Sequence, residues 1–444
     1  MGQRSRILAQ LLGFDGYRVE EYRFILTDGC DWLSIDSRPP PADAKLILRL
    51  TSRWQRRCST CGARCDKIHE RLQPRRWRDL PMGTHPVEIE YTACRVYCQS
   101  CRNAVVEAVP WADRFQRQTH RLQQMVALEA LSMPVVHVAA KHALSWKTVH
   151  RIEFDAIGRW EHSRRTPPLR RVGIDEKYRG RKSRGFVTIV SNLDTGEPIW
   201  MAEGRSIETV QRWIGTLSDA EKSGITLFAM DMFDAFVSAI RSEPAFNNVP
   251  IVHDAFHVIK RAGEAIDELR RSIFFRAGDE MRRLGRGKRW LLLRPWESCT
   301  PSQQLELTSL LACNRTLARA YQFREQLRDL LCNATNNPDY FRVGFECLLR
   351  RIQRRNCKPL RKLHDTLRAK RDELAALVNH RPPTGRIEAL NTSWEALVRR
   401  ARGARDAQYL LRRLRFMVAN PIRHERDVRR FLALNIAAPT SAAA

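Results

Sequence analysis

The 444-residue sequence predicts a multidomain α+β protein, and three observations support this fold class. Six of its 12 cysteines lie between Cys58 and Cys101, among short segments with the periodicity of β-strands. A middle region alternates between strand-like and helical segments, and most of the remaining chain is helical and basic. A chain of this length is sufficient for two or three domains.

The chain is strongly basic. It has 77 lysine and arginine residues and 49 aspartate and glutamate residues, for a formal net charge of +28 and a pI near 10.4. Such an excess indicates a polyanionic partner, with nucleic acid as the first candidate. A membrane surface is the alternative, but no apolar run approaches the length of a spanning helix, so we expect no membrane partner. The first residues lack the apolar core of a signal peptide, which predicts a cytoplasmic protein.

The N-terminal part is predicted to contain two segments. Residues 1–45 are expected to form a helical segment that ends at the proline-rich residues 38–41. Residues 46–112 are expected to form a zinc-binding β module. Within this module, residues 46–50 and 87–91 alternate between apolar and polar side chains, as half-buried strands do.

Two Cys-x2-Cys pairs mark the metal site of the β module: Cys58 with Cys61, and Cys98 with Cys101. Each pair places two thiolates on one tight turn, and two pairs complete a tetrahedron around Zn²⁺. Because four thiolates leave no open coordination position, we expect a structural zinc. Cys65 and Cys94 stay open as substitute ligands, and buried free thiols are the alternative without metal. A disulfide framework is not expected in a cytoplasmic chain.

Residues 115–165 are predicted to form a helix-turn-helix DNA-binding segment. A first helix covers residues 133–144, and Ser145 is a suitable N-cap for a second helix over residues 146–152. In such a motif the second helix enters the major groove. The side chains expected near DNA are Lys147, Thr148, His150 and Arg151. The alternative is an ordinary helical pair with a solvated basic face.

Residues 170–260 have the pattern of an α/β domain after a proline-containing linker at residues 166–168. Three strands, a helix, a strand, a second helix and a last strand are predicted in that order. Asp194-Thr-Gly196 is a hairpin signal between the second and third strands. The predicted strands cover residues 172–177, 186–192, 198–203, 226–230 and 249–253, and the helices cover residues 207–217 and 233–242.

Three acidic residues are candidates for a metal site. Asp175 and Asp231 each end an apolar strand pattern, and Glu388 opens a helical stretch. Carboxylates at matching ends of adjacent strands can share hard cations such as Mg²⁺ or Mn²⁺, which prefer oxygen ligands and assist in-line attack on phosphorus. The alternative for each acid is a turn or helix-capping role. Neighbouring acids that compete with the three candidates are Glu176, Asp234, Asp254 and Glu395.

The C-terminal half is predicted to be mainly helical. Residues 261–381 form a basic helical segment, residues 382–420 contain the helix with Glu388, and residues 421–444 are a C-terminal tail. Basic clusters such as Arg282-Arg283 and residues 286–289 are candidates for holding DNA, although a solvated charged surface is the alternative.

Five short motifs between residues 173 and 403 occur in the same order as the motifs of a known family. They are Gly173-Ile-Asp-Glu176, Met230-Asp-Met-Phe233, Asp254-Ala-Phe-His257, Arg386-Ile-Glu-Ala-Leu-Asn391 and Arg399-Arg-Ala-Arg-Gly403. Together with the cysteine pairs and the helix-turn-helix, they make residues 45 to about 420 similar to bacterial insertion-sequence transposases of the IS-L-three family, a branch of the DDE transposases. Each motif is weak alone, but their order and spacing together are specific.

The resemblance implies an RNase H-like catalytic core formed by residues 170–260 and 382–420 and interrupted by the helical insertion of residues 261–381. It implies that Asp175, Asp231 and Glu388 bind the catalytic metal, with Asp254 and His257 in supporting roles. It further implies binding of the terminal inverted repeats, DNA cleavage, and strand transfer to target DNA. Joining two DNA ends requires at least a homodimer, and the expected location is the bacterial cytoplasm, associated with the nucleoid.

Two other functions are compatible with the residues. One is a non-enzymatic DNA-binding regulator, whose function would survive the loss of Asp231. The other is an RNase H-like structure-selective nuclease, which would cleave DNA equally well with and without the terminal repeats.

Overall fold

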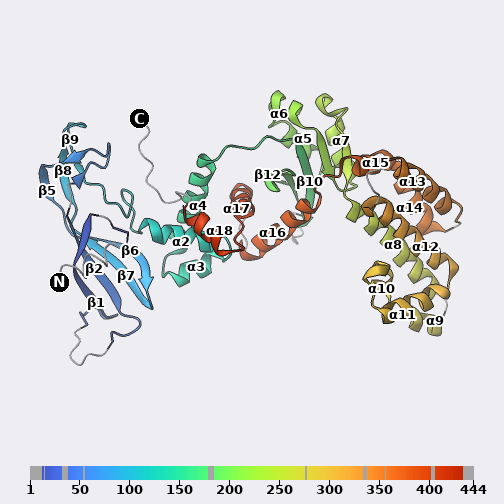
Figure 1. Cartoon of the computed structure of the whole chain (residues 1–444), viewed down its shortest axis with the longest axis horizontal. Coiled ribbons are helices and arrows are strands. Elements are labelled where there is room, and N and C mark those ends of the chain that lie inside the picture. The colour runs from blue at the N-terminus through green and yellow to red at the C-terminus, as the bar shows by residue number, and fades with distance from the viewer. Residues whose placement is uncertain are drawn as a thin grey trace. The chain divides into compact units, whose positions relative to one another are not determined.

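Figure 1 shows the computed structural model of the chain, which describes residues 13–14, 16–32, 39–53, 56–178, 185–275, 278–333, 338–355, 357–401 and 406–433. The chain divides into two compact units. The N-terminal unit contains residues 1–165, 400–402 and 420–444, and the second unit contains residues 166–399 and 403–419. No helix among the described residues is long and apolar enough to cross a membrane.

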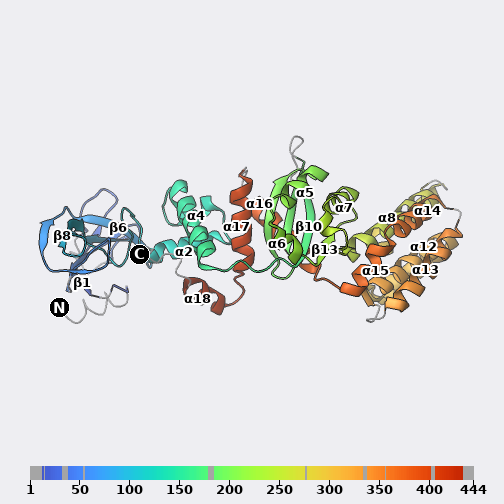
Figure 2. The same ribbon diagram turned by 90° about the horizontal axis from the view of Figure 1, so that it is seen from above.

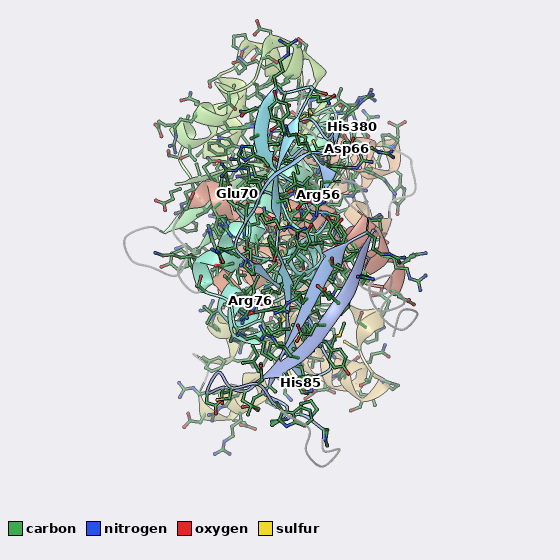
Figure 3. The ribbon with its side chains drawn as sticks, turned by 90° about the vertical axis from the view of Figure 1, so that its left-hand side faces the viewer. Arg56, Asp66, Glu70, Arg76, His85 and His380 are labelled. Atoms are coloured by element: carbon green, nitrogen blue, oxygen red, sulfur yellow. The ribbon has the colours of Figure 1, made fainter. Side chains whose placement is uncertain are left out.

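A four-stranded sheet forms the base of the N-terminal unit. Its order is β1 (Tyr17–Ile25), β2 (Lys45–Ser52), β7 (His85–Tyr91) and β6 (Arg75–Met82), with β2 and β7 parallel and the other pairs antiparallel. One face packs around the buried indole of Trp111, which lies within 4.8–5.7 Å of four aromatic rings. The opposite face is charged: Arg76 of β6, labelled in Figure 3, binds Glu90 of β7 (Nε–Oε2, 2.8 Å).

Strand β1 corrects the prediction of a helical segment over residues 1–45. Its apolar residues alternate as Tyr17 and Val19, then, after a bulge between Val19 and Glu21, as Tyr22 and Phe24. The bulge shifts the alternation of apolar and polar residues by one position, so the sequence does not show a continuous strand pattern. Residues 17–25 are extended because they pair with β2. The helical start predicted for residues 1–12 lies outside the described residues.

The cysteine-rich part is built from short strands, as the β module predicts. Strands β5 (Ile68–Arg71), β8 (Cys94–Cys98) and β9 (Asn103–Val106) form an antiparallel sheet, and β3 (Arg56–Arg57) pairs with β4 (Arg64–Cys65). Only a small cluster of side chains, mainly cysteines with Val96, is buried here. A core of this size contributes little stability, so the module depends on a further cross-link.

Helices complete the N-terminal unit. They are α2 (His120–Ala130), α3 (Val135–Lys141), α4 (Trp146–Ser163) and α18 (Glu425–Ala433). The predicted helical pair is confirmed, although α3 is shorter than residues 133–144 because Pro134 caps its start and Ala143 has a positive φ of 47° at its end. Helix α18 corrects the predicted tail of residues 421–444: Phe431 is buried, and Gln124 of α2 donates to the carbonyl of Leu432 (3.4 Å).

A five-stranded sheet with order β12-β11-β10-β13-β14 is the centre of the second unit (Figure 2). Strands β10, β11 and β12 are antiparallel neighbours, whereas β13 and β14 run parallel to β10. All five predicted strands are confirmed within a few residues. Their bounds are β10 Arg171–Tyr178, β11 Phe186–Asn192, β12 Glu197–Glu203, β13 Leu227–Met230 and β14 Ile251–His253.

Each face of this sheet buries a different core. Val172, Ile174, Phe228 and Met230 pack with helices α5 (Ile207–Ile214) and α7 (Asp234–Arg241). The alternate residues, including Ala229 and Val252, belong to a second core that extends into the C-terminal helices. The short helix α6 (Asp219–Gly224), which the sequence pattern missed, begins with a Ser218–Glu221 capping box.

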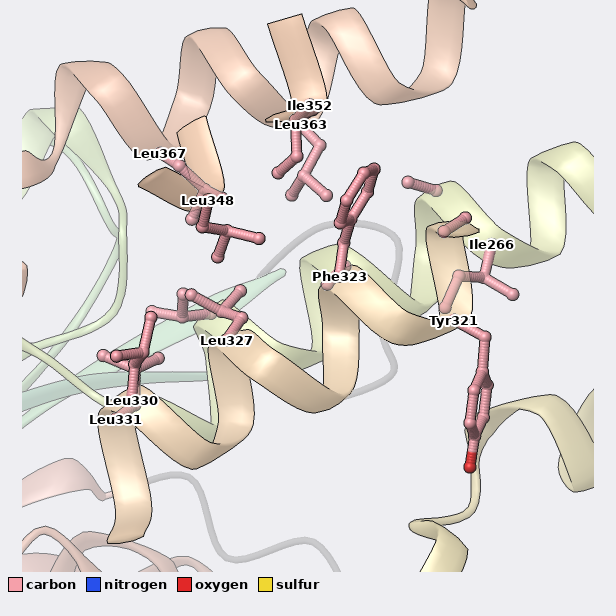
Figure 4. Close-up of a cluster of buried hydrophobic side chains, with 14 of the residues drawn as sticks. Ile266, Tyr321, Phe323, Leu327, Leu330, Leu331, Leu348, Ile352, Leu363 and Leu367 are labelled. Atoms are coloured by element: carbon pink, nitrogen blue, oxygen red, sulfur yellow. The ribbon is translucent and has the colours of Figure 1, made fainter. Parts of the chain in front are cut away.

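The helical prediction for residues 261–381 is confirmed. The helices are α8 (Ala255–Phe274), α9 (Asp279–Gly285), α10 (Arg289–Leu293), α11 (Pro301–Ala312), α12 (Arg315–Arg328), α13 (Pro338–Gln353), α14 (Lys358–Ala369) and α15 (Arg371–His380). Short 3₁₀ or π turns cover Pro244–Phe246, Trp296–Ser298 and Asp329–Asn333. Figure 4 shows how leucine, isoleucine and aromatic side chains from α8, α12, α13 and α14 form one core.

After the helical region, two further helices pack against the five-stranded sheet. Helix α16 (Gly385–Ala401) packs on β10, and α17 (Ala407–Ala419) packs along β12, where Arg415 Nε lies 3.3 Å from Glu197 Oε2. Residues 402–405, which include the end of the Arg399–Gly403 motif, lie outside the described residues.

Candidate functional site

Four thiols meet in the cysteine-rich part of the N-terminal unit. The Sγ atoms of Cys58, Cys61, Cys98 and Cys101 all lie within 4.8 Å of one another, with separations of 3.9 Å for Cys58–Cys101 and 3.5 Å for Cys61–Cys98. Four sulfurs at about 2.3 Å from a tetrahedral Zn²⁺ are about 3.8 Å apart. The donor set and its spacing therefore fit zinc.

Backbone amides donate to two of these thiols. The amide of Cys101 donates to Cys98 Sγ (3.5 Å), and this bond lowers the pKa of Cys98 to about 6. The amide of Thr60 donates to Cys58 Sγ (3.3 Å). Cys65 and Cys94 are buried nearby but are not members of the four-sulfur group, and Cys65 Sγ instead donates to the carbonyl of Ala63 (3.6 Å).

The exposed side of helix α4 carries the predicted DNA-contacting residues. Ser145 accepts a hydrogen bond from the amide of Thr148 (3.1 Å), so the predicted N-cap is confirmed. Val149 and Ile152 are buried, whereas Lys147 and Arg151 are exposed and Thr148 and His150 are half-buried. The first two turns of α4 thus present two cations, Lys147 and Arg151, to solvent.

Two aromatic residues on this helix were missed by the sequence pattern. His150 stacks on Trp146 at 4.9 Å between ring centroids and on Phe154 at 6.5 Å, and both aromatic side chains are exposed. Their spacing of four residues is the signal that would have revealed them. These two rings keep the His150 imidazole nearly parallel to their own planes. The stacking therefore limits the directions in which the imidazole can approach DNA.

The helices are fixed to the four-stranded sheet by a buried carboxylate. Asp79 of β6 accepts hydrogen bonds from Thr119 Oγ1 (2.6 Å) and Arg121 Nε (2.7 Å), at the start of α2. Charge-assisted bonds of this kind are about twice as strong as neutral ones. The β module and the three helices therefore form one unit and not two loosely connected modules.

In the second unit, strand register brings Asp175 and Asp231 together. Ile174 of β10 pairs with Met230 of β13 in parallel. Asp175 is the next residue of β10, and Asp231 is the first residue after the end of β13. Neighbouring strands lie about 4.8 Å apart, so the two residues follow neighbouring positions of the sheet. Strand alternation places Asp175 on the face that carries Gly173.

Helix α16 packs against this same face. A Cβ atom at Gly173 would lie 3.2 Å from Ile387 Cγ1, so the helix crosses the strand at the one residue that has no side chain. Arg386 Nη1 donates to the carbonyl of Leu193 (2.7 Å) and also to that of Asp194, which fixes the start of the helix to the β11–β12 hairpin. Glu388 is the next residue after Ile387 and is exposed.

The three candidate carboxylates do not form a closed ligand set. Among the described residues, only the four cysteines gather three or more metal-ligating atoms within 4.8 Å of one another. Asp175 is 5% exposed, and its Oδ2 atom has no hydrogen-bond donor among the described residues, although Lys177 Nζ lies 3.3 Å away. A buried carboxylate oxygen that accepts no hydrogen bond fits a hard cation, so Asp175 is suited to Mg²⁺.

Asp254 and His257 lie beside Asp231. Asp254 follows β14 and caps α8 by accepting from the amide of Phe256 (3.2 Å). His257 Nδ1 is 2.8 Å from Asp231 Oδ1 and 3.4 Å from Asp254 Oδ2. Burial alone would lower the pKa of His257, but its interactions with Asp231 and Asp254 outweigh burial and raise that pKa to about 9. The imidazolium therefore neutralises part of the acidic charge.

The competing acids have other partners. Asp234 pairs with Lys370 (2.6 Å), which lowers the pKa of Asp234, and Glu395 pairs with Arg399 (3.4 Å) on α16. Glu176 alternates to the opposite face from Asp175 and pairs with Arg205 (3.4 Å). Burial, and to a lesser degree the charges of Asp231 and Asp175, raise the pKa of Glu176.

Comparisons with known proteins agree with this organisation. Residues 172–414 match the DDE domain of ISL3 (IS-L-three) transposases, described as transposase. Residues 107–153 match the helix-turn-helix domain of transposase family ISL3, and residues 54–101 match the zinc finger of the transposases of IS204, IS1001, IS1096 and IS1165.

Two whole proteins extend the similarity. The transposase for insertion sequence element IS1001 of Bordetella parapertussis is 28% identical over 416 residues, covering 92% of this chain and 97% of that protein. The transposase for element IS1557 of Mycobacterium tuberculosis is 28% identical over 434 residues, covering 91% and 94%.

The matches also define the cofactors and the partner. The zinc-finger match and the four-cysteine cluster indicate Zn²⁺, the DDE match implies a divalent metal such as Mg²⁺, and the helix-turn-helix match indicates DNA. The chain therefore belongs to the ISL3 family of insertion-sequence transposases, which are DNA-cleaving enzymes.

Proposed function

We propose that this transposase cuts DNA at the ends of its insertion sequence and joins those ends to target DNA with one metal site, formed by Asp175, Asp231 and Glu388. The observation that carries the proposal is the parallel pairing of Ile174 in β10 with Met230 in β13, because Asp175 and Asp231 are the residues that follow these two. Asp175 Oδ2 is buried and accepts no hydrogen bond among the described residues, although Lys177 pairs with it at 3.3 Å, and this supports a metal-ligand role.

Each side chain has a proposed task. Asp175 and Asp231 hold divalent cations, Mg²⁺ or Mn²⁺, and Glu388 completes the set from α16. When bound, such cations activate an attacking oxygen and stabilise the leaving oxygen of an in-line displacement. His257 positions Asp231 through the 2.8 Å contact, and Asp254 positions His257. A water at the element end and then a 3′-hydroxyl can use the same site, because both attack phosphorus in line.

We further propose that the five-stranded sheet is an RNase H-like core, with α8–α15 as an insertion between its last strand and α16. The strand order and the three antiparallel strands followed by two parallel ones support this assignment. The insertion explains why Glu388 follows Asp231 by 157 positions (388 − 231), since the sheet itself requires no such distance.

Recognition of the terminal inverted repeats is assigned to the N-terminal unit. Lys147, Thr148, His150 and Arg151 of α4 contact the DNA, and Cys58, Cys61, Cys98 and Cys101 bind the structural zinc that stabilises the β module. The contacts of Asp79 with α2 support joint action of the two parts. Because two ends must be joined, the active species is a homodimer or a larger oligomer.

The test is a comparison of Asp231→Asn with Asp234→Asn. The first removes one charge from the proposed site, and the second removes one charge three residues away, where Lys370 is the partner. Loss of several kcal/mol of transition-state stabilisation predicts at least about a 100-fold slower cleavage for Asp231→Asn, with unchanged binding to the terminal repeat. Asp234→Asn should cleave at close to the wild-type rate.

Two outcomes would overturn the proposal. Wild-type cleavage by Asp231→Asn would exclude the carboxylate site. Equal cleavage of DNA with and without terminal repeats would indicate a nuclease that does not recognise element ends.

A further inference from the structure

Helix α13 borders a groove that none of the sites above uses. The groove has a volume of about 520 Å³ and is lined by five arginines and one glutamate, namely Arg342, Arg350, Arg351, Arg354, Arg371 and Glu346. The formal charge of these six side chains is +4, from five positive charges and one negative charge. A concave surface with this charge is suited to a polyanion.

The sequence of α13 produces the groove. Phe341, Phe345, Leu348, Leu349 and Ile352 are buried, and their spacing of three and four residues defines one apolar face. In Figure 4, Leu348 and Ile352 point into the same core as Phe323 and Leu327 of α12. Arg342, Arg350 and Arg351 lie on α13 outside this apolar face, and Arg354 follows the last residue of the helix. Arg371 adds a cation from the start of α15.

Part of this charge has no internal partner. Arg342 pairs with Asp339 (3.1 Å) and Arg371 pairs with Glu346 (3.0 Å), whereas Arg351 donates to the neutral amide of Gln326 (2.8 Å). Within the part of the chain that the structure describes, no carboxylate pairs with Arg350, Arg351 or Arg354.

The basic cluster predicted from the sequence differs in this respect. Arg282 pairs with Asp279 (3.5 Å), Lys288 pairs with Glu306, and Arg289 lies 3.7 Å from Asp267. Acids thus pair with three of the five cations of that cluster, and among the described residues no carboxylate pairs with Arg283 or Arg286. The α13 groove has three such arginines, and they line one concave surface.

The shape of the groove selects the part of DNA that can enter it. Base edges are recessed in the grooves of a duplex and are reached by a protruding helix or strand, whereas the sugar-phosphate backbone is the protruding ridge. A concave site between helices therefore accepts the backbone. Twelve residues separate Arg342 from Arg354, which is roughly 18 Å along a helix axis and its continuation, or about five base-pair steps.

We propose that the α13 groove binds the phosphates of duplex DNA without reading its sequence. The inference rests on the proposed function only in taking DNA as the polyanion. Duplex of arbitrary sequence reaches a transposase in two forms, as the flank beside the element end and as target DNA. Both present the same backbone chemistry, and the two are separated by experiment.

The first test measures DNA binding of the full-length chain with Arg350→Ala/Arg354→Ala. Arg315→Ala/Arg319→Ala is the matched control, because it removes two exposed arginines of α12 that do not line the groove. Each lost phosphate contact reduces the slope of log affinity against log salt by about 0.9. We expect the groove variant to lose about two units of slope and about tenfold in affinity for random-sequence duplex, while the control keeps both values.

Two comparisons show whether the groove binds the DNA flanking the element or the target DNA. If the groove holds the flank, the variant loses affinity for a terminal repeat with a flank but not for a repeat cut at the element end. If it holds target DNA, the variant binds both ends normally and loses strand transfer into a separate duplex. Unchanged salt slope, end binding and strand transfer together would overturn the proposal.

A native thiol provides the second test. Cys347 lines the groove, and Cys313 is an exposed cysteine at the end of α11 that does not. Random-sequence duplex should slow alkylation of Cys347, measured by mass spectrometry, and leave Cys313 unchanged. Equal alkylation of Cys347 with and without DNA would contradict the proposal. The binding and alkylation measurements can use Asp231→Asn, and strand transfer is measured with Asp231 intact, so a failed groove and a failed catalytic site are distinguishable.

Discussion

Gly173→Ala provides the most direct test of how α16 reaches the candidate metal site. The new Cβ would lie 2.7 Å from Ser191 Oγ, 2.8 Å from Leu193 Cδ2 and 3.2 Å from Ile387 Cγ1. Carbon atoms in contact settle at about 3.5–4.0 Å, so Leu193 would have to retreat by at least about 0.7 Å and Ile387 by about 0.3 Å. Ser191 and Leu193 are buried and have little space to move.

The expected cost is that of overpacking a core, about 1–3 kcal/mol of unfolding free energy. Because Ile387 belongs to the turn that carries Glu388, α16 should also detach more often, and DNA cleavage should decrease. Hydrogen exchange measured by mass spectrometry over residues 385–401 reports the first effect, and cleavage of a terminal-repeat duplex reports the second.

Gly385→Ala is the matched control, since an added Cβ at this residue of α16 meets nothing within 4 Å. It should exchange and cleave like the wild-type protein. If Gly173→Ala left the exchange of α16, the stability and the cleavage rate unchanged, the packing of α16 on β10 and the resulting position of Glu388 would be refuted.

Three further predictions concern zinc, pH and the helix-turn-helix. Cys98→Ser should lose the one zinc ion per chain measured by elemental analysis, whereas Cys65→Ser should retain it; equal loss in both variants would contradict the four-cysteine site. Because the pKa of His257 is raised to about 9 from 6.5, its protonated form stabilises the metal-free fold fully below pH 6.5, and this contribution disappears as the pH rises through 9. His257→Gln should flatten that dependence of the urea midpoint on pH, and a wild-type profile would assign the titration to another group. Ser145→Ala removes the N-cap of α4 and should cost about 1 kcal/mol, with weaker binding to the terminal repeat in a gel-shift titration; unchanged stability and binding would show that the cap is not required.

Several parts of the fold could be predicted because their signal is local. The strand of residues 186–192 was predicted with the observed bounds, and Ser145 was identified as a cap from its own residue type and the helix that follows. The cysteine pairs are equally local, since two residues between thiols already define a turn. Strand β1 escaped prediction because a bulge shifts its alternation, and the bulge is set by pairing with β2.

Helix α18 could not be predicted because its packing depends on a contact between distant residues. Five of its nine residues are charged, so its sequence shows little apolar pattern. Phe431 becomes buried and Leu432 contacts α2 only in the folded protein, because α2 lies about 300 residues earlier in the chain. No local pattern carries that information.

For the metal site, the candidate acids could be identified from the residue pattern, because an apolar run ends at Asp175 and another at Asp231, and ordered motifs surround both. Contacts between distant parts of the chain fixed the rest: the two strands are parallel neighbours with Ile174 opposite Met230, Asp234 pairs with Lys370, and His257 lies against Asp231. The fold also placed the unpaired arginines in the α13 groove. The physical reason is that residue type fixes what a side chain can bind, whereas burial, register and competing ion pairs depend on residues far away in the sequence.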